Sequence, residues 1–232
     1  WTEEELAPIF DAISSQVNSE ENQLVLQEIT ELEQRGLVNF PAWHVRFLHI
    51  KSKLFIGTAQ LDTALTIARQ SQKIARANDL VELTAHGQIL LGDIFLTKAR
   101  HAESLQYYQA AEDYFRAVNG QEALNTFLSK KAIVLAIQSQ SAAAEATIQE
   151  MLLTVEQLSA RNQFDLYSNI ANVYAILNDH LNSIRLNHKA YDLAIANGWV
   201  KLQASISNNI AYSFAALRQF DQARRYYHQA LA

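Results

Sequence analysis

A repeat of about 40 residues constrains this chain more than any other feature of its sequence. Its two clearest copies occupy residues 169–174 (NIANVY) and 209–214 (NIAYSF). A small residue recurs in the same phase at Ala211, Ala171, Ala132, Gly92, Ser52 and Ala12. A second small residue follows most of these, at Ala223, Ser183, Ala144, Ser104 and Ala64. A fixed period of this length is typical of solenoids, in which each repeat is too small to bury its apolar face alone.

Composition and local patterns predict helices for these repeats. The 232 residues include only two prolines and six glycines, which favours long helices joined by short turns. Phe164, Tyr167 and Tyr174 are spaced by three and by seven residues, which are steps of one and two helical turns, so they share one face of a helix. Thr2 and Glu5 form a capping-box pattern, which predicts a helix start at the N-terminus.

We therefore expect an all-α chain that forms a right-handed superhelical solenoid of about six antiparallel helix pairs. The repeats are expected near residues 3–36, 41–78, 81–119, 121–160, 163–197 and 200–232. No Ser/Gly/Pro-rich linker divides the chain, so one continuous solenoid over 1–232 is the simplest organisation. The chain begins at Trp1 and its last helix has no polar capping helix after it, so we expect a fragment of a longer protein.

Charge and composition argue against several classes of function. The formal net charge is -5 and no cluster of Lys and Arg occurs along the sequence, so nucleic-acid binding by this region is not expected. The chain has no cysteine, which excludes disulfides, thiol catalysis and Cys-ligated zinc. No run of about 18 apolar residues is present, so no membrane span is expected.

The repeat resembles that of the tetratricopeptide repeat (TPR) family. The shared features are the small residue of the first helix, an aromatic residue three positions later, and small residues that open and close the second helix. The aromatic residues are Phe55, Phe95, Tyr174 and Phe214, and the closing residues are Ala111, Ala190 and Ala230. The repeats differ from the family's in being longer than its usual 34 residues, in lacking its tryptophan and its proline, and in placing Lys131 at a normally apolar position.

Longer repeats of this kind are similar to those of bacterial regulatory proteins, such as peptide-pheromone receptors, maltose-regulator-type activators and sensor regions fused to diguanylate cyclases. The resemblance implies a non-enzymatic module, without a cofactor, that binds a protein or peptide in a concave groove. It further implies the sensor or regulatory region of a bacterial signalling protein, a transcription regulator or a diguanylate cyclase, in the cytoplasm or periplasm.

The resemblance also implies which residues line that groove. Carried onto this chain, the groove positions that we single out are Arg46, Lys53, His86, Asp93, Lys130, Asn169, Asn172, Asn208, Asn209 and Tyr212. The asparagines are the sharpest signal, because a carboxamide can pair with the C=O and the N–H of a peptide bond together. The alternative interpretation is that these asparagines bond to neighbouring helices or face water.

Two other functions remain open at this stage. The first is a constitutive assembly scaffold that acts by partner docking or by self-association. Tyr226, Tyr227 and Leu231 on the last helix suggest a homodimer through the C-terminal helix pair. An enzyme is the second, but no pattern of catalytic residues supports it. No metal site is expected, since His44 and His49 lie about 140° apart around a helix and cannot share an ion.

Overall fold

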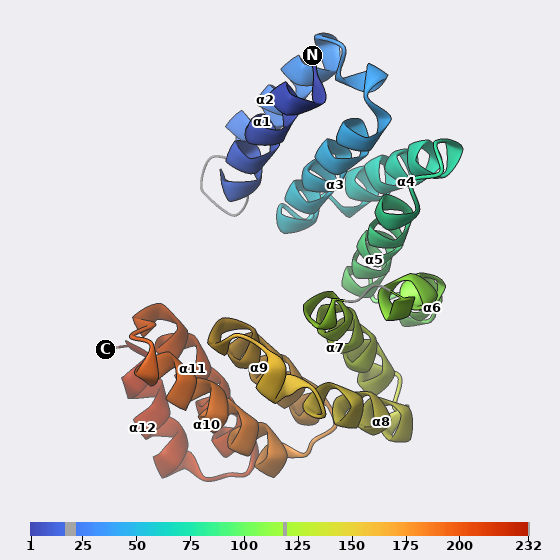
Figure 1. Ribbon diagram of the computed structural model, residues 1–232. Coiled ribbons are helices and arrows are strands. Elements are labelled where there is room, and N and C mark those ends of the chain that lie inside the picture. The colour runs from blue at the N-terminus through green and yellow to red at the C-terminus, as the bar shows by residue number, and fades with distance from the viewer. Residues whose placement is uncertain (17–21, 118–119, 232) are drawn as a thin grey trace. The chain divides into compact units, whose positions relative to one another are not determined.

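The computed structural model describes residues 1–16, 22–117 and 120–231, and these residues form α-helices and short 3₁₀ helices but no strand (Figure 1). Two compact units make up the chain. Unit 1 is Trp1–Ala117 and unit 2 is Val118–Ala232. The expected all-α, TPR-like repeat fold is confirmed. That the whole chain forms one continuous solenoid, and that it belongs to a longer protein, stay predictions.

In unit 1, consecutive helices pack against each other as hairpins (Figure 1). The elements are α1 (Glu3–Gln16), α2 (Asn22–Gln34), η1 (Leu37–Asn39), α3 (Pro41–Gly57), α4 (Leu61–Ala77), α5 (Val81–Thr97) and α6 (His101–Ala117). Helix α1 begins as the sequence predicts. The backbone N–H of Thr2 donates to Glu5 Oε2 at 2.7 Å, and that of Glu5 donates to Thr2 Oγ1 at 3.2 Å. This reciprocal capping box satisfies backbone donors that the helix itself cannot pair.

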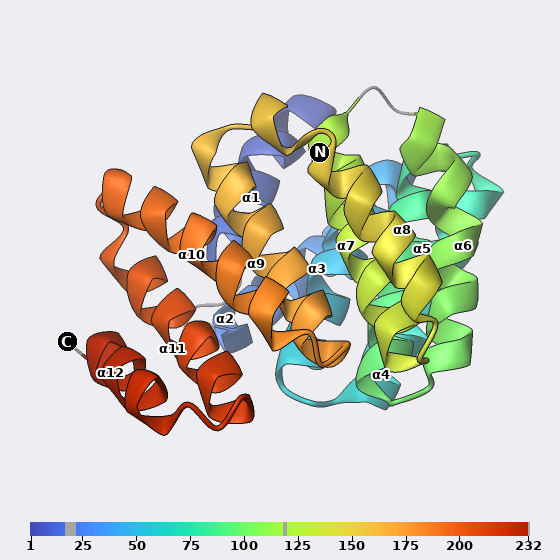
Figure 2. The same cartoon turned by 90° about the horizontal axis from the view of Figure 1, so that it is seen from below.

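Unit 2 repeats the same plan. Its elements are α7 (Gln121–Ile137), α8 (Ser141–Leu152), η2 (Val155–Gln157), α9 (Ala160–Ile176), α10 (His180–Ala196), α11 (Val200–Ala216) and α12 (Phe220–Leu231). Figure 2 shows α9, α10, α11 and α12 following one another in sequence order, with α10 packed between α9 and α11. The helices agree with the predicted repeats, although α9 begins three residues before 163. Residues 118, 119 and 232, which end two predicted repeats, lie outside the described residues.

The recurrent small residues lie where two helices approach closely. Ser52 Oγ donates to the backbone carbonyl of Ala64 at 3.0 Å, and Ser104 Oγ donates to that of Gly92 at 2.8 Å. All four residues are buried. A side chain of one helix reaches the backbone of its partner only because neither position carries a bulky group. The small residues therefore set the distance between the helices of a hairpin.

The first repeat departs from this rule. Ala12 is exposed, whereas the neighbouring Ile13 is 2% exposed, so the predicted phase is wrong in α1. The reason is the packing of α1, which buries Leu6 and Ile13, seven residues apart on one helix face, in an apolar cluster shared with α2 and α3. Large side chains rather than small ones make this contact.

Most helices end in the same three-residue turn. In the turn after α3, the N–H of Gln60 donates to the carbonyl of Phe55 at 2.8 Å and that of Ala59 donates to the carbonyl of Ile56 at 3.0 Å, which is the Schellman pattern. The middle residue of each such turn is left-handed, with φ between 52° and 67° at Ala59, Asp79, Ala99, Ser139, Asn178, Gly198 and Arg218. Only one of these residues is glycine, so the packing of the hairpins holds the backbone in a conformation that L-residues disfavour.

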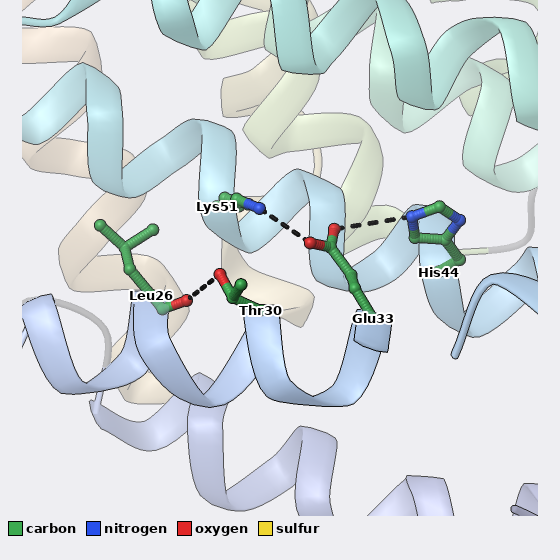
Figure 3. A network of polar contacts seen from close by, with 5 residues as sticks. All are labelled: Leu26, Thr30, Glu33, His44 and Lys51. Carbon is green, nitrogen blue, oxygen red and sulfur yellow. Dashed lines mark hydrogen bonds and ion pairs between the residues drawn. The ribbon is translucent and has the colours of Figure 1, made fainter. Parts of the chain in front are cut away.

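A polar contact joins α2 to α3 beside the apolar cluster of unit 1. Lys51 Nζ donates to Glu33 Oε2 at 3.0 Å, and His44 Nε2 lies 3.6 Å from Glu33 Oε1. In Figure 3 both partners reach the Glu33 carboxylate from α3, while Thr30 bonds only within α2, to the carbonyl of Leu26. The hydrogen bond from His44 and the charge of Lys51 lower the pKa of the Glu33 carboxyl, although burial opposes them.

This carboxylate makes the stability of unit 1 dependent on pH. Because the pKa of Glu33 is lower in the folded chain than its unfolded value of about 4.3, the unfolded chain takes up the proton first. The stabilisation is therefore present above pH of about 4.3 and is lost as the pH falls through the lower folded-state value. We expect Glu33→Gln to cost about 1 kcal/mol at pH 7 and to make the acid-induced loss of stability less steep.

Urea unfolding between pH 3 and pH 7 measures this effect. Glu28→Gln is the matched control, since Glu28 is exposed on the same helix and forms no hydrogen bond or ion pair with a described residue of α3. If the two variants lose stability with the same pH profile, the Glu33 contact does not couple α2 to α3.

Candidate ligand-binding surface

The candidate asparagines lie on the exposed faces of α9 and α11. Helix α9 buries Ile170 and Ala171 and thereby leaves Asn169 and Asn172 exposed. On α11, Asn208, Asn209 and Tyr212 are exposed, while Ile210 and Ala211 are buried. Asn169 and Asn209 therefore hold the same position relative to the buried residues of their helices. We call Asn169, Asn172, Asn208 and Asn209 the asparagine stripe.

The asparagine stripe is free to bind. None of its four side chains forms a hydrogen bond with a residue that the structure describes. Tyr212 lies beside Asn208 and Asn209 on α11 and is 59% exposed. The centroid of its ring is 6.2 Å from that of His180, and the two rings meet edge to face. Unpaired carboxamides next to an exposed aromatic ring can together take a polar backbone and an apolar side chain. The alternative that these asparagines bond to neighbouring helices therefore has no support among the described residues, whereas the alternative that they simply face water stays open.

A polar cleft of about 90 Å³ adjoins the stripe between α7 and α9. Asn169 lines it together with Glu122, Asn125 and Asp165. Asn125 is buried at its base, where its Nδ2 donates to Thr154 Oγ1 at 3.3 Å. Sequence reasoning missed Glu122 and Asn125 because they precede Lys130, the groove position singled out in their repeat, by eight and five residues. Their heptad-like spacing from Ser129 and Ala132 is the only sequence signal that points to them.

Lys130 and the four candidates of unit 1 have different surroundings. Lys130 is half-buried on α7. Arg46 Nη2 lies 3.9 Å from Glu82 Oε1, and Lys53 is exposed on the same helix as Arg46, α3. On α5, the exposed His86 meets the rings of Tyr114 and Phe115 edge-on, at 6.4 and 5.3 Å.

Asp93, also on α5, is held by a structural contact. It accepts a hydrogen bond of 2.6 Å from the hydroxyl of Tyr108, a side chain that is fully buried. Burial and the Asp93 charge raise the pKa of Tyr108, so the phenol stays protonated and remains the donor. The carboxylate of Asp93 therefore fixes Tyr108 in the core of unit 1.

The basic residues of α3 and α5 share one surface with a half-buried histidine, His49 of α3. His49 Nε2 is buried without a hydrogen-bond partner among the described residues. Burial, together with the charges of Lys53, His86 and Arg46, lowers the pKa of His49 to about 3. The histidine is thus neutral near pH 7, and the surface around it is basic. Unit 1 and unit 2 therefore present different chemistry at equivalent positions of their repeats.

Three further features of residues 1–16, 22–117 and 120–231 bear on function: metal binding, membrane insertion and self-association. No group of three or more His, Asp or Glu side chains there is placed to hold a metal ion. No helix in these ranges is long and apolar enough to cross a bilayer. Helix α12 leaves Phe220 and Leu231 67% and 85% exposed, so the expected homodimer through the last helix pair stays a prediction.

Comparisons of sequence find no relative, whereas comparisons of structure do. No protein-family profile matches the chain, and no curated protein matches it in sequence. The apo form of RapI is similar over 100% of this chain and 84% of its own, with a TM-score of 0.75 and 14% identity. BtubC (BKLC) from P. vanneervenii is similar over 97% and 89%, with a TM-score of 0.66 and 16% identity.

A third structure, a Rap protein complexed with Competence and Sporulation Factor, is similar over 98% of this chain and 64% of its own, with a TM-score of 0.64 and 16% identity. At identities this low, such matches show a common fold. The chain therefore has the fold of the TPR-like repeat proteins. The lengths of its helix pairs and its buried small residues are consistent with that fold.

Proposed function

We propose that this chain is a non-enzymatic TPR-type module that binds a peptide, or a peptide-like segment of a protein, through the asparagine stripe of unit 2. The observation that carries the proposal is the absence of hydrogen-bond partners for the four exposed carboxamides among the described residues. Exposed carboxamides at equivalent positions of two repeats can each pair with one peptide bond of an extended chain. Recognition of the backbone leaves the ligand sequence to be selected by neighbouring side chains.

Those neighbouring side chains favour a peptide that carries both an apolar and a polar side chain. Tyr212 offers an apolar face to one ligand side chain, and the cleft beside Asn169 offers the carboxylates of Glu122 and Asp165 to a polar one. The structurally similar Rap protein was solved with Competence and Sporulation Factor bound, which supports this mode of action for the fold. In a regulatory or sensor protein, such binding would shift the equilibrium between conformations of the module and so change the activity of an attached or partner domain.

The proposal is tested with a peptide selected from a random library on the whole chain, measured by isothermal titration. We expect the double variant Asn169→Ala/Asn209→Ala to bind it about 30-fold more weakly, because two bidentate contacts at about 1 kcal/mol each are lost. N-methylation of single peptide bonds in the ligand should weaken binding as strongly as replacement of its side chains, since the carboxamides grip the backbone.

Gln70→Ala/Gln222→Ala is the matched control. It also removes two exposed carboxamides, one from α4 and one from α12, but neither lies in the stripe. Affinity that is unchanged in the stripe variant, or reduced equally in the control, contradicts the assignment of the site.

A further inference from the structure

Helix α4 carries a basic face that the asparagine stripe does not explain. Arg69, Lys73 and Arg76 follow one another at steps of four and three, so they share one side of the helix over about 10 Å. All three side chains are exposed, and none forms an ion pair with a described residue. Like charges at this spacing repel each other and destabilise a helix. Only Arg76, in the last turn of α4, interacts favourably with the helix dipole.

The same face borders a cleft of about 380 Å³. Besides the three basic residues, Gln72 of α4, Leu91 of α5 and Tyr107 of α6 line it. Tyr107 stacks on Phe95 with the ring centroids 5.2 Å apart, which holds its ring in place as an apolar wall. The cleft therefore combines a rim of positive charge with a wall of apolar surface, and it lies entirely within unit 1.

Gln72, one of the residues that line this cleft, carries an unpaired acceptor. Gln72 is only 6% exposed, and its Nε2 donates to the carbonyl of Thr84 at 3.0 Å, which fixes the orientation of the carboxamide. Its Oε1 is buried without a partner among the described residues. A buried acceptor without a donor is costly, and a ligand that brings an N–H group into the cleft would relieve that cost.

Two other second helices, α6 and α10, do not share this face. The residues of α6 that correspond to Arg69, Lys73 and Arg76 are Gln109, Asp113 and Arg116. On α10 the corresponding residues are His188, Asp192 and Ile195. Neither helix therefore carries the three cations that α4 presents, in a chain whose formal net charge is -5. An ordinary solvated helix face with charges of both signs would not look like this.

From the rim, the wall and the unpaired Gln72 acceptor we infer that the α4 face docks an acidic peptide segment of a partner protein. Aspartate or glutamate side chains of that segment meet Arg69, Lys73 and Arg76, which are free to form bidentate or simple ion pairs. An apolar side chain of the segment packs on Leu91 and Tyr107. A backbone N–H of the first turn of the segment's helix, which has no partner within that helix, donates to Gln72 Oε1. A purely anionic surface, such as a nucleic acid or a lipid headgroup layer, would leave the apolar wall and the acceptor unused.

Fluorescence anisotropy on the whole chain tests this inference. The probe is a dye-labelled 14-residue helical peptide in which Glu recurs at every third or fourth position and Leu occupies one face; its partner probe has Gln in place of every Glu. We expect the acidic peptide to bind and the Gln peptide not to. Arg69→Gln/Lys73→Gln/Arg76→Gln should weaken binding about tenfold, equivalent to about 1.4 kcal/mol, and should reduce its dependence on salt.

Arg185→Gln/Lys201→Gln/Arg225→Gln is the matched control, since it removes the same charge from exposed positions of unit 2. We expect the control to bind the acidic peptide as the unmodified chain does. An equal loss in both variants would show attraction by net charge only and would overturn the inference. The inference would also be overturned if a 14-nucleotide single strand, or vesicles with an anionic lipid, bound more tightly than the acidic peptide and the α4 variant abolished that binding.

The two proposed binding sites can be tested independently of each other. Asn169→Ala/Asn209→Ala leaves α4 unchanged, so we expect it to bind the acidic peptide normally. If that stripe variant loses the acidic peptide while the α4 variant keeps it, the acidic segment binds the stripe and the α4 face is not its site.

Discussion

Gly92→Ala is expected to lower the free energy of unfolding by about 2 kcal/mol, although alanine is the better helix former. A Cβ atom at Gly92 would come within 2.5 Å of Tyr108 Cδ1 and 3.1 Å of Tyr108 Cζ. Tyr108 cannot move aside, because its ring is fully buried and its hydroxyl donates to Asp93. Overpacking of about 3 kcal/mol therefore exceeds the gain of about 1 kcal/mol in helix propensity.

Gly57→Ala is the control for this prediction. Gly57 ends α3, and a Cβ atom there would meet nothing within 4 Å. We expect this variant to be as stable as the unmodified chain or up to about 1 kcal/mol more stable. Chemical denaturation monitored by circular dichroism measures both. Equal stability of Gly92→Ala and Gly57→Ala would mean that α5 and α6 do not approach as closely as the structure shows.

Phe47→Ala should have a larger effect, a loss of about 4 kcal/mol of stability. Phe47 is fully buried in the cluster that joins α1 and α2 to α3, and its ring meets that of Phe10 edge-on at 5.5 Å. Removal of the ring leaves a cavity that three helices border, and such a site collapses only in part. Hydrogen exchange should show faster exchange in α1 and α2, which depend on this cluster for their packing.

Leu24→Ala provides the comparison within the same region. Leu24 lies on α2 but is 55% exposed, so its truncation should change stability by less than about 0.5 kcal/mol. If Phe47→Ala is no more destabilising than Leu24→Ala, or if the exchange of α1 and α2 does not change, the cluster does not hold these helices on α3.

Whether a candidate surface can be predicted from the sequence depends on whether the residues of one helix or of several helices form it. The asparagine stripe follows from the sequence, because Asn169 and Asn209 repeat with the helix positions that Ala171 and Ala211 mark. The cleft beside Asn169 does not follow, since Glu122 and Asn125 come to it from a different helix. The basic face of α4 is visible in the sequence as spacing alone. Only the neighbouring Leu91 and Tyr107 make it the rim of a cleft.

The basic surface on α3 and α5 illustrates the same limit. Arg46, His49 and Lys53 are separated along the chain from His86, and no run of basic residues connects them. Burial is the main cause of the lowered pKa of His49, and the nearby charges of Lys53, His86 and Arg46 add to it; His86 comes close because α3 packs against α5. A search of the sequence for clusters of Lys and Arg therefore does not detect a surface of this kind.

By itself the sequence determined that the chain forms paired helices, and which small residues lie between most of them. Those properties depend on local hydrogen bonds and on a hydrophobic period that recurs along one helix. The tertiary structure alone decided that Ala12 is exposed and that Ala59, Ala99 and Arg218 adopt a left-handed backbone. Neither property is favoured by the residue itself, since each arises from packing between helices whose combined free energy exceeds a local preference of about 1 kcal/mol.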